Sequence, residues 1–171
     1  CACVSVHGAN RLGGNSLLDI VVFGRKAAQV ISESLKNTPS KIDINNLDKH
    51  SVEQAQQRIQ HWQQATQDLN TEPTSDNIKA IKADLQSIME DGCGVFREHD
   101  TMQQAIEKLP AIAKRIEQVK LTDNSNVFNL ERLNAFELEN LLGIAYATAY
   151  SALTRKESRG AHSRVDFTER D

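Results

Sequence analysis

Apolar residues recur at steps of three and four through three long segments of this chain, the spacing that places them on one face of an α-helix. The segments begin near Ser51, Asp76 and Thr101. A fourth segment, residues 130–154, is rich in leucine and alanine and is also expected to be helical. Helices joined by short loops predict a mainly α protein built as an antiparallel bundle. The apolar positions of the first three segments are Val52, Ala55, Ile59, Trp62 and Thr66, then Ile78, Ile81, Leu85, Ile88 and Met89, then Met102, Ala105, Leu109, Ile112, Ile116 and Val119.

The ends of these helices are predicted from residues that cap helices. Ser51 with Gln54, and Thr101 with Gln104, have the spacing of a capping box. Asp76 is a candidate N-cap for the second segment.

Proline and polar stretches interrupt the pattern. Pro110 falls inside the third segment and predicts a kink or a break near Leu109, because proline lacks the N–H that a helix interior needs. Residues 121–129 are polar and rich in asparagine and predict a loop. Residues 155–171 are charged and predict an extended tail.

The segment before residue 49 has a different character. Residues 2–6 alternate small and β-branched side chains, as in a short strand. Residues 17–36 are apolar on almost every side, and Asn15 or Ser16 is expected to cap the helix that they form. Such a helix is expected to be buried in something larger than this chain. Residues 37–50 contain a proline and have no period, so they predict a linker and a domain boundary.

The turn between this strand and helix has the most promising chemistry. Arg11 stands among Gly8, Gly13 and Gly14, and its guanidinium could bind a carboxylate or phosphate through two hydrogen bonds. The alternative is a surface arginine beside a turn. The glycine spacing matches neither G-x-G-x-x-G nor the P-loop. The following helix N-terminus offers N–H groups to an electron-rich ligand, or it is an ordinary capped helix.

The other candidates have structural alternatives. His7 could be a hydrogen-bonding core group, since no His, Cys or Asp spacing in the chain is typical of a metal site. Cys93 is expected to be a small buried apolar residue. Residues 157–166 hold two arginines and a histidine around a glycine, which suits an anion site or, as the favoured interpretation, a structural network of ion pairs.

Composition limits the class of protein. The formal net charge of −3 gives no reason to expect a nucleic-acid partner or an acidic membrane surface. Aromatic residues make up only 5% of the chain, which favours helices over a β-sandwich. No apolar run reaches the roughly 18 residues that a membrane span needs, and no signal peptide is recognisable. Cys1, Cys3 and Cys93 form no C-x-x-C pair, which favours reduced thiols. The chain opens within a strand-like run, so we expect it to be a piece of a longer polypeptide.

Both ends of the chain carry a specific resemblance. Residues 4–19 (VSVHGANRLGGNSLLD) with residues 21–25 (VVFGR) closely resemble the flavoprotein subunit of succinate dehydrogenase, respiratory complex II. Residues 157–164 (ESRGAHSR) with Asp166, and residues 145–149 (AYATA), are similar to the same succinate dehydrogenase/fumarate reductase flavoprotein family. The middle of the chain agrees in length and helical pattern.

The resemblance implies a role for each residue of the turn. Arg11 matches the arginine that binds a carboxylate of succinate or fumarate, and Ser16 and Leu17 match positions that contact FAD. The implied reaction removes a hydride from succinate to the flavin and passes electrons to an iron–sulfur subunit, in the respiratory chain and tricarboxylic acid cycle. No catalytic residue and no metal ligand of the family is expected within this chain.

The family also implies a domain organisation. Residues 1–48 would be the end of an FAD-binding domain, residues 49–156 an up-and-down helical domain similar in type to a spectrin repeat, and residues 157–171 a charged tail leading to an absent C-terminal segment. The dinucleotide fingerprint and the residues that hold FAD covalently are not in this sequence. The chain alone is therefore expected to bind no FAD and to be inactive.

Partners, location and alternatives follow from the same resemblance. The implied partners are the iron–sulfur and membrane-anchor subunits, and a flavinylation assembly factor is a further candidate. The implied location is the cytoplasmic face of the bacterial inner membrane, or the matrix face in a mitochondrion. The alternatives are a fumarate reductase or L-aspartate oxidase relative and a non-enzymatic helical interaction module.

Overall fold

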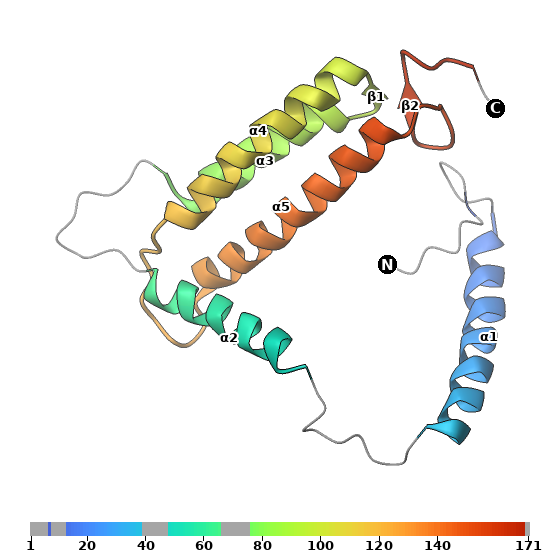
Figure 1. Ribbon diagram of the computed structural model, residues 1–171, viewed down its shortest axis with the longest axis horizontal. Coiled ribbons are helices and arrows are strands. Elements are labelled where there is room, and N and C mark those ends of the chain that lie inside the picture. The colour runs from blue at the N-terminus through green and yellow to red at the C-terminus, as the bar shows by residue number, and fades with distance from the viewer. Residues whose placement is uncertain (1–6, 8–12, 39–47, 66–75, 170–171) are drawn as a thin grey trace.

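The structure, a computed structural model, describes residue 7 and residues 13–38, 48–65 and 76–169. These residues form five helices and two short strands (Figure 1). The elements in chain order are α1 Asn15–Asn37, α2 Lys49–Gln64, α3 Ile78–Cys93, β1 Phe96–Arg97, α4 His99–Gln118, α5 Leu130–Thr154 and β2 Ser163–Arg164. The predicted strand at residues 2–6 and the segment 66–75 lie outside the described residues.

Helices α3, α4 and α5 pack against one another as an up-and-down bundle (Figure 1). The apolar residues of α3 and α4 predicted from their spacing supply a large share of its core. The core also takes alanines from one face of α5, where small side chains let the helices approach. The predicted mainly α, bundled fold is therefore confirmed, and α5 begins and ends where the sequence predicted.

The contact between α3 and α4 is close at Gly92. A Cβ at this position would collide with the Cβ of Ala105 and would lie 3.0 Å from the carbonyl oxygen of Thr101. Helix α4 runs without interruption through Pro110. Of the two predicted alternatives near Leu109, a kink or a break, the break is therefore wrong. Leu109 and Ile112 are buried on either side of the exposed proline, and this packing holds the helix together.

The residues that cap α2 and α3 are not the ones predicted from the sequence. Asp48 caps α2 by accepting hydrogen bonds from the backbone N–H groups of His50 and Ser51, so the capping box at Ser51 is wrong. Asn77 caps α3 through the N–H of Ala80. Thr101 donates its hydroxyl to the Glu98 carbonyl and caps no backbone N–H there.

Asp76 has a different role from the predicted cap. Its two carboxylate oxygens accept hydrogen bonds of 2.7 Å each from the guanidinium of Arg115 on α4. The same guanidinium also donates to Asp84 on α3. The Arg115 guanidinium lowers the pKa of Asp76 below its usual range, so Asp76 joins the start of α3 to α4 as a charged group.

Among the described residues, helix α2 joins the bundle through its C-terminal half. Trp62 is fully buried and donates its indole N–H to Glu139 on α5 at 2.8 Å, and Arg58 also pairs with Glu139. Leu121, predicted to lie in a loop, is buried, and its N–H donates to the Ala65 carbonyl. Val52 and Ile59, predicted to face the core, are about half exposed.

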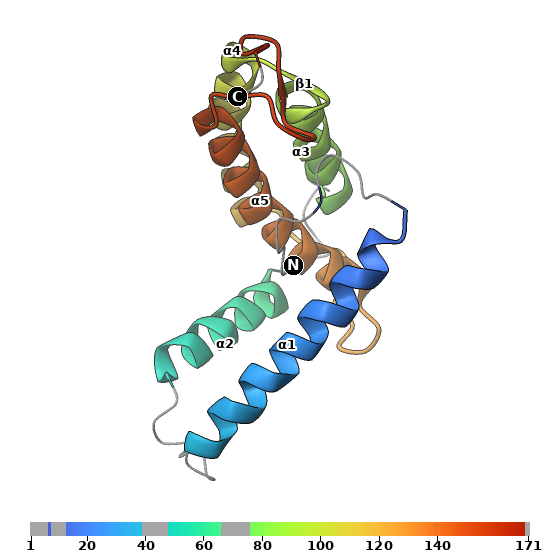
Figure 2. The same cartoon turned by 90° about the vertical axis from the view of Figure 1, so that its right-hand side faces the viewer.

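Helix α1 buries none of its residues among the parts of the chain that the structure describes. Its large apolar side chains are between 40% and 66% exposed. Figure 1 shows it away from the three-helix bundle, and Figure 2 shows the same helix from a second side. The exposure agrees with the expectation that this helix needs a further surface to cover it. None of the described helices is long and apolar enough to cross a lipid bilayer.

Candidate functional site

The start of α1 carries a hydrogen-bonded cluster centred on His7. The Nε2 atom of His7 lies 3.0 Å from Oδ2 of Asp19, and its Nδ1 lies 3.1 Å from Nδ2 of Asn15. An amide nitrogen only donates and a carboxylate only accepts, so this geometry suits an imidazole with its proton on Nε2. Asn15 and Asp19 are four residues apart on one face of the helix, and His7 bridges them.

Helices α2, α3 and α5 are each capped by an aspartate or asparagine side chain, and the N-terminus of α1 differs from theirs. Its N-cap residue is Gly14, which has the left-handed backbone φ of +76° that favours glycine. No side chain of the described residues caps it, and its first turn has no acidic residue. The prediction that Asn15 or Ser16 caps the helix is wrong, because Asn15 lies inside the helix and donates its amide to His7.

The described residues leave the space beside this helix start unfilled. A Cβ at Gly13 or Gly14 would meet no atom of the described residues within 4 Å. Ser16 is half-buried in the first turn and Leu17 beside it is exposed. An uncapped helix N-terminus carries a partial positive charge, so it favours an electron-rich or anionic group. Arg11, the third predicted site residue, lies outside the described residues, as does Gly8.

The roles of Asn15 and Asp19 were missed in the sequence. Both were read only as parts of a helix start or an apolar helix. The signal available was their spacing of four residues, which places two polar side chains on one face of an otherwise apolar helix beside a preceding histidine.

The second candidate, the tail after α5, folds back over the bundle instead of extending from it. Strand β2 pairs in parallel with β1, with Phe96 opposite Ser163 and Arg97 opposite Arg164. The prediction of an extended tail is therefore wrong. Two-residue strands give no periodic signal, so a pairing between such distant parts of the chain was not detectable from sequence.

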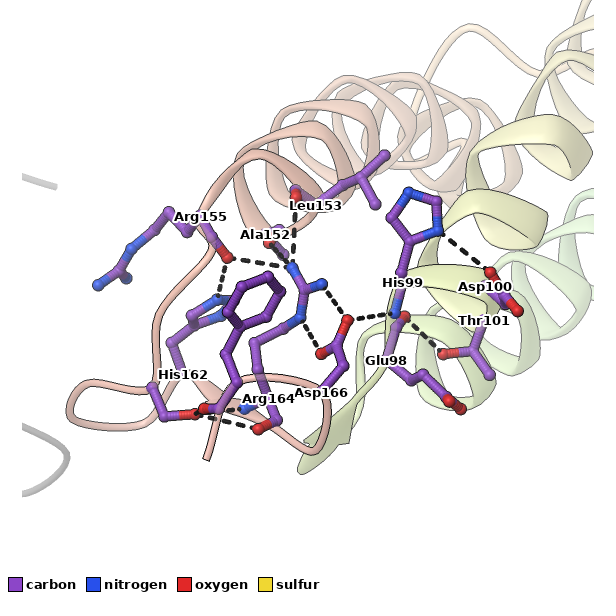
Figure 3. Close-up of polar contacts among 12 residues, drawn as sticks. Glu98, His99, Asp100, Thr101, Ala152, Leu153, Arg155, His162, Arg164 and Asp166 are labelled. Atoms are coloured by element: carbon purple, nitrogen blue, oxygen red, sulfur yellow. Dashed lines mark hydrogen bonds and ion pairs between the residues drawn. The ribbon is translucent and has the colours of Figure 1, made fainter. Parts of the chain in front are cut away.

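The folded tail, residues 155–169, is called the cap of the bundle below. Arg164 is at its centre and is only 2% exposed. Its guanidinium donates to the carbonyls of Ala152, Leu153 and Arg155 at the C-terminus of α5, at 3.0–3.4 Å. It also donates to both oxygens of Asp166, at 2.5 and 2.7 Å (Figure 3). The positive group thus satisfies carbonyls that a helix end leaves unpaired.

Asp166 connects the same cap to the start of α4, which lies at the same end of the bundle as the C-terminus of α5. Its Oδ2 accepts the backbone N–H of His99 at the start of α4, at 3.3 Å (Figure 3). The Arg164 guanidinium lowers the pKa of Asp166 to about 2. His162 is buried and bonds to the Arg155 carbonyl through Nε2 and to the Arg97 guanidinium through Nδ1. The buried arginine and histidine are therefore used in holding the cap, as the favoured structural interpretation predicted.

The described residues hold no group of three or more His, Cys, Asp and Glu placed to bind a metal ion. Cys93 is buried, and burial raises the pKa of its thiol. The candidate chemistry is thus concentrated at the start of α1.

Comparison with known proteins identifies the family. The model of the family described as "Fumarate reductase flavoprotein C-term" matches residues 82–171. The chain belongs to this family. Its match covers α4, α5, the tail and most of α3, the part of the chain that supplies most of the buried core.

Curated relatives match the whole chain, including the start of α1. The chain is 46% identical over 171 residues to a succinate dehydrogenase flavoprotein subunit of Coxiella burnetii, covering 100% of the chain and 27% of that relative. It is 39% identical over 173 residues to a fumarate reductase flavoprotein subunit of Escherichia coli, with the same coverage of 100% and 27%. The chain thus spans about a quarter of the length of the relatives that it matches.

Solved structures of the same family superpose on this chain. A quinol–fumarate reductase with menaquinol molecules superposes with a TM-score of 0.79 at 38% identity, over 100% of this chain and 28% of that one. The Sdh1 complex of Mycobacterium smegmatis in the apo form gives 0.75 at 33% identity, over 95% of this chain and 26% of that one.

Proposed function

We propose that this chain is the C-terminal part of an FAD-containing succinate dehydrogenase subunit, which oxidises succinate to fumarate. The observation that carries the proposal is the match over all 171 residues to a succinate dehydrogenase flavoprotein subunit at 46% identity. The match includes the turn before α1, and the helix start behind that turn is uncapped and open among the described residues.

Arg11 is the proposed substrate-binding residue. A guanidinium offers two parallel N–H donors to a carboxylate, and succinate and fumarate each carry a carboxylate at both ends. An arginine in this role fixes the orientation of the substrate as well as its affinity, because both donors must be aligned with one carboxylate.

Ser16 and Leu17 are the proposed FAD contacts. Two observations support this role for the start of α1: no described side chain caps its first turn, and a Cβ at Gly13 or Gly14 would meet no described atom within 4 Å. The partial positive charge of the helix N-terminus would stabilise negative charge on the ring system. Bound FAD would accept the hydride that succinate loses as the carbon–carbon double bond forms. The base that takes the accompanying proton would come from the part of the protein outside this chain.

The proposed partners follow from the assemblies named above. An iron–sulfur subunit would take the electrons, and membrane-anchor subunits would hold the complex on the cytoplasmic face of a bacterial inner membrane or the matrix face of a mitochondrion. A flavinylation assembly factor is a further proposed partner. The 171-residue chain by itself is expected to bind no FAD, so a titration should leave flavin fluorescence unquenched.

The second candidate is a fumarate reductase, favoured by the 35–40% identity to several fumarate reductase flavoprotein subunits. An L-aspartate oxidase is a further alternative, in which the same turn would bind aspartate. The third alternative, a non-enzymatic helical module, predicts that residues 49–169 bind a partner protein without any role for Arg11.

The test uses the full-length parent protein. Dye reduction with succinate, with aspartate, and the reverse reaction with fumarate separate the three enzyme alternatives. Arg11→Ala should lower kcat/KM for succinate by at least about 100-fold through loss of a charge-assisted pair. Lys36→Ala, which removes a cation at the far end of α1, is the matched control. Near-normal succinate turnover in Arg11→Ala would contradict the proposal.

A further inference from the structure

His162 is the histidine that the cap buries, and it is 4% exposed. Its Nε2 atom lies 3.1 Å from the carbonyl oxygen of Arg155, at the end of α5 (Figure 3). Its Nδ1 atom lies 2.9 Å from a guanidinium nitrogen of Arg97 on β1. One imidazole therefore joins the cap to the end of α5 and to the strand that follows α3.

The two partners fix the protonation state of this imidazole. A carbonyl oxygen only accepts a hydrogen bond, so Nε2 of His162 carries a proton. A guanidinium only donates and stays protonated in proteins, so Nδ1 is the acceptor and carries none. The contacts of the closed cap thus require a neutral imidazole. A second proton, on Nδ1, would point an N–H at the N–H of Arg97 and bring two cations into contact.

We infer that the cap is a pH-sensitive switch: when His162 takes up a proton, the cap separates from β1 and from the end of α5 while the bundle stays folded. The hydrophobic core of the described residues contains no residue of the cap, which supports a local opening. Arg97 is also held by a hydrogen bond to the Gly94 carbonyl, at 3.1 Å, so its guanidinium is kept beside the imidazole. The inference does not depend on the proposed function, because every residue in it lies in the cap or the bundle.

Glu157 is the carboxylate of the cap that a protonated His162 would attract. Hydrogen bonds from Arg155 lower the pKa of Glu157, so it stays charged over the range in which exposed histidines titrate. Its charge is already paired with Arg155, at 2.5 Å, and with Arg159, at 3.8 Å. The group in direct contact with Nδ1 is instead the cation of Arg97, and this contact opposes the second proton.

The other titratable groups at this end of the bundle keep their contacts over the same pH range. A bonded guanidinium lowers the pKa of Asp166 to about 2, so this carboxylate stays charged. Burial raises the pKa of the Cys93 thiol, which stays neutral. His99, at the start of α4, is exposed and faces Asp100, a partner that a protonated imidazole keeps. A proton on His162, in contrast, breaks a contact that holds the cap.

Hydrogen exchange at the backbone N–H of Val165 measures opening of the cap, since this group donates to the Arg97 carbonyl across the two strands, at 2.9 Å. In the 171-residue chain, the exchange rate divided by the intrinsic rate at each pH gives the open fraction. A released histidine titrates near about pH 6.5, so a change from about pH 7.5 to about pH 5.5 should raise the open fraction about 10-fold. The N–H of Leu109, in the core of α4, should stay more protected than that of Val165 at both pH values.

Three variants test whether the imidazole proton is the cause. His162→Gln keeps one donor and one acceptor but takes up no proton, so its open fraction should change less than about 2-fold between the same pH values. Arg97→Gln can donate to Nδ1 or accept from it, so this variant should also lose most of the pH dependence. His99→Gln, at an exposed histidine of the same end, is the matched control and should keep the 10-fold change.

Three results would overturn the inference. The first is an open fraction at Val165 that does not change with pH in the wild-type chain. The second is a 10-fold change that persists in His162→Gln or, if that variant does not fold, in Arg97→Gln. The third is equal protection of Val165 and Leu109 at about pH 5.5, because acid would then unfold the bundle instead of releasing the cap.

Discussion

The start of α1 and the tail after α5 have similar residue types but opposite accessibility. Both combine glycine, histidine and arginine with a nearby aspartate, and sequence alone marked both as possible anion sites. In the tail, the guanidinium of Arg164 is 2% exposed and fully occupied by three carbonyls and Asp166. At the start of α1, the described polar groups leave an uncapped helix end and open space beside two glycines. Residue types suggest a site, and the groups left unpaired decide whether one is present.

The largest expected effect on this comparison is at Arg164. Arg164→Ala should lower the free energy of unfolding of the 171-residue chain by about 3 kcal/mol, because it leaves a carboxylate and the end of α5 without their donor. Arg159→Ala, at a 66%-exposed side chain, should change it by less than about 0.5 kcal/mol. Urea unfolding followed by far-UV circular dichroism measures both. If Arg164→Ala lowered the free energy of unfolding as little as Arg159→Ala does, the cap would not be structural.

A smaller loss is expected where α3 and α4 meet. Gly92→Ala should destabilise the bundle by about 1–3 kcal/mol, since the new Cβ would overlap the side chain of Ala105. Gly143→Ala in α5 is the matched control: its Cβ would meet no described atom within 4 Å, so alanine should stabilise the helix by up to about 1 kcal/mol. Thermal midpoints of the two variants should move in opposite directions. A shift of the same sign would contradict this packing.

The cap should also make stability depend on acid pH. The pKa of Asp166 is about 2 in the folded chain, against an ordinary value of 3.8, so its stabilising effect is complete above pH 4. Stability should fall as the pH drops from about 4 towards 2, because the unfolded chain takes up the proton first. Asp76, whose pKa is lowered by Arg115, contributes in the same direction. Asp166→Asn should flatten this part of the profile, and an unchanged slope in that variant would exclude the assignment.

The smallest expected effect on stability is at the segment that contains α1. Removal of residues 1–47 should leave the free energy of unfolding of the bundle within about 0.5 kcal/mol of its original value, because α1 supplies no residue to the core and Asp48, the cap of α2, is kept. The two lengths of chain can be compared by urea unfolding. A large loss on truncation would mean that α1 supports the bundle in solution.

The sequence predicted the parts of the fold that repeat. Ile81, Leu85, Leu109 and Ile116 lie in the core as their helical spacing indicated, and residues 130–154 form one helix. The helix starts were predicted less well, because several polar residues in a row can cap and tertiary partners decide among them. Asp76, for example, pairs with Arg115, so Asn77 becomes the cap.

The candidate site was predicted in its residue types more than in its contacts. The turn with Arg11 was identified from its glycines and its family resemblance, and its binding role stays a prediction. The cluster around His7 depends on three side chains that come together only when the segment meets α1. The fold of the tail depends on pairing between residues 96–97 and 163–164, which are far apart in the chain.

The most direct test of the contrast between the two regions measures activity and stability in one protein. In the full-length parent, Arg11→Ala should abolish most succinate-dependent dye reduction and leave the thermal midpoint near wild type. Arg164→Ala should lower the thermal midpoint, and the kcat/KM of its folded fraction should stay close to wild type. The opposite pattern, with Arg11→Ala active or Arg164→Ala as stable as wild type, would contradict the account.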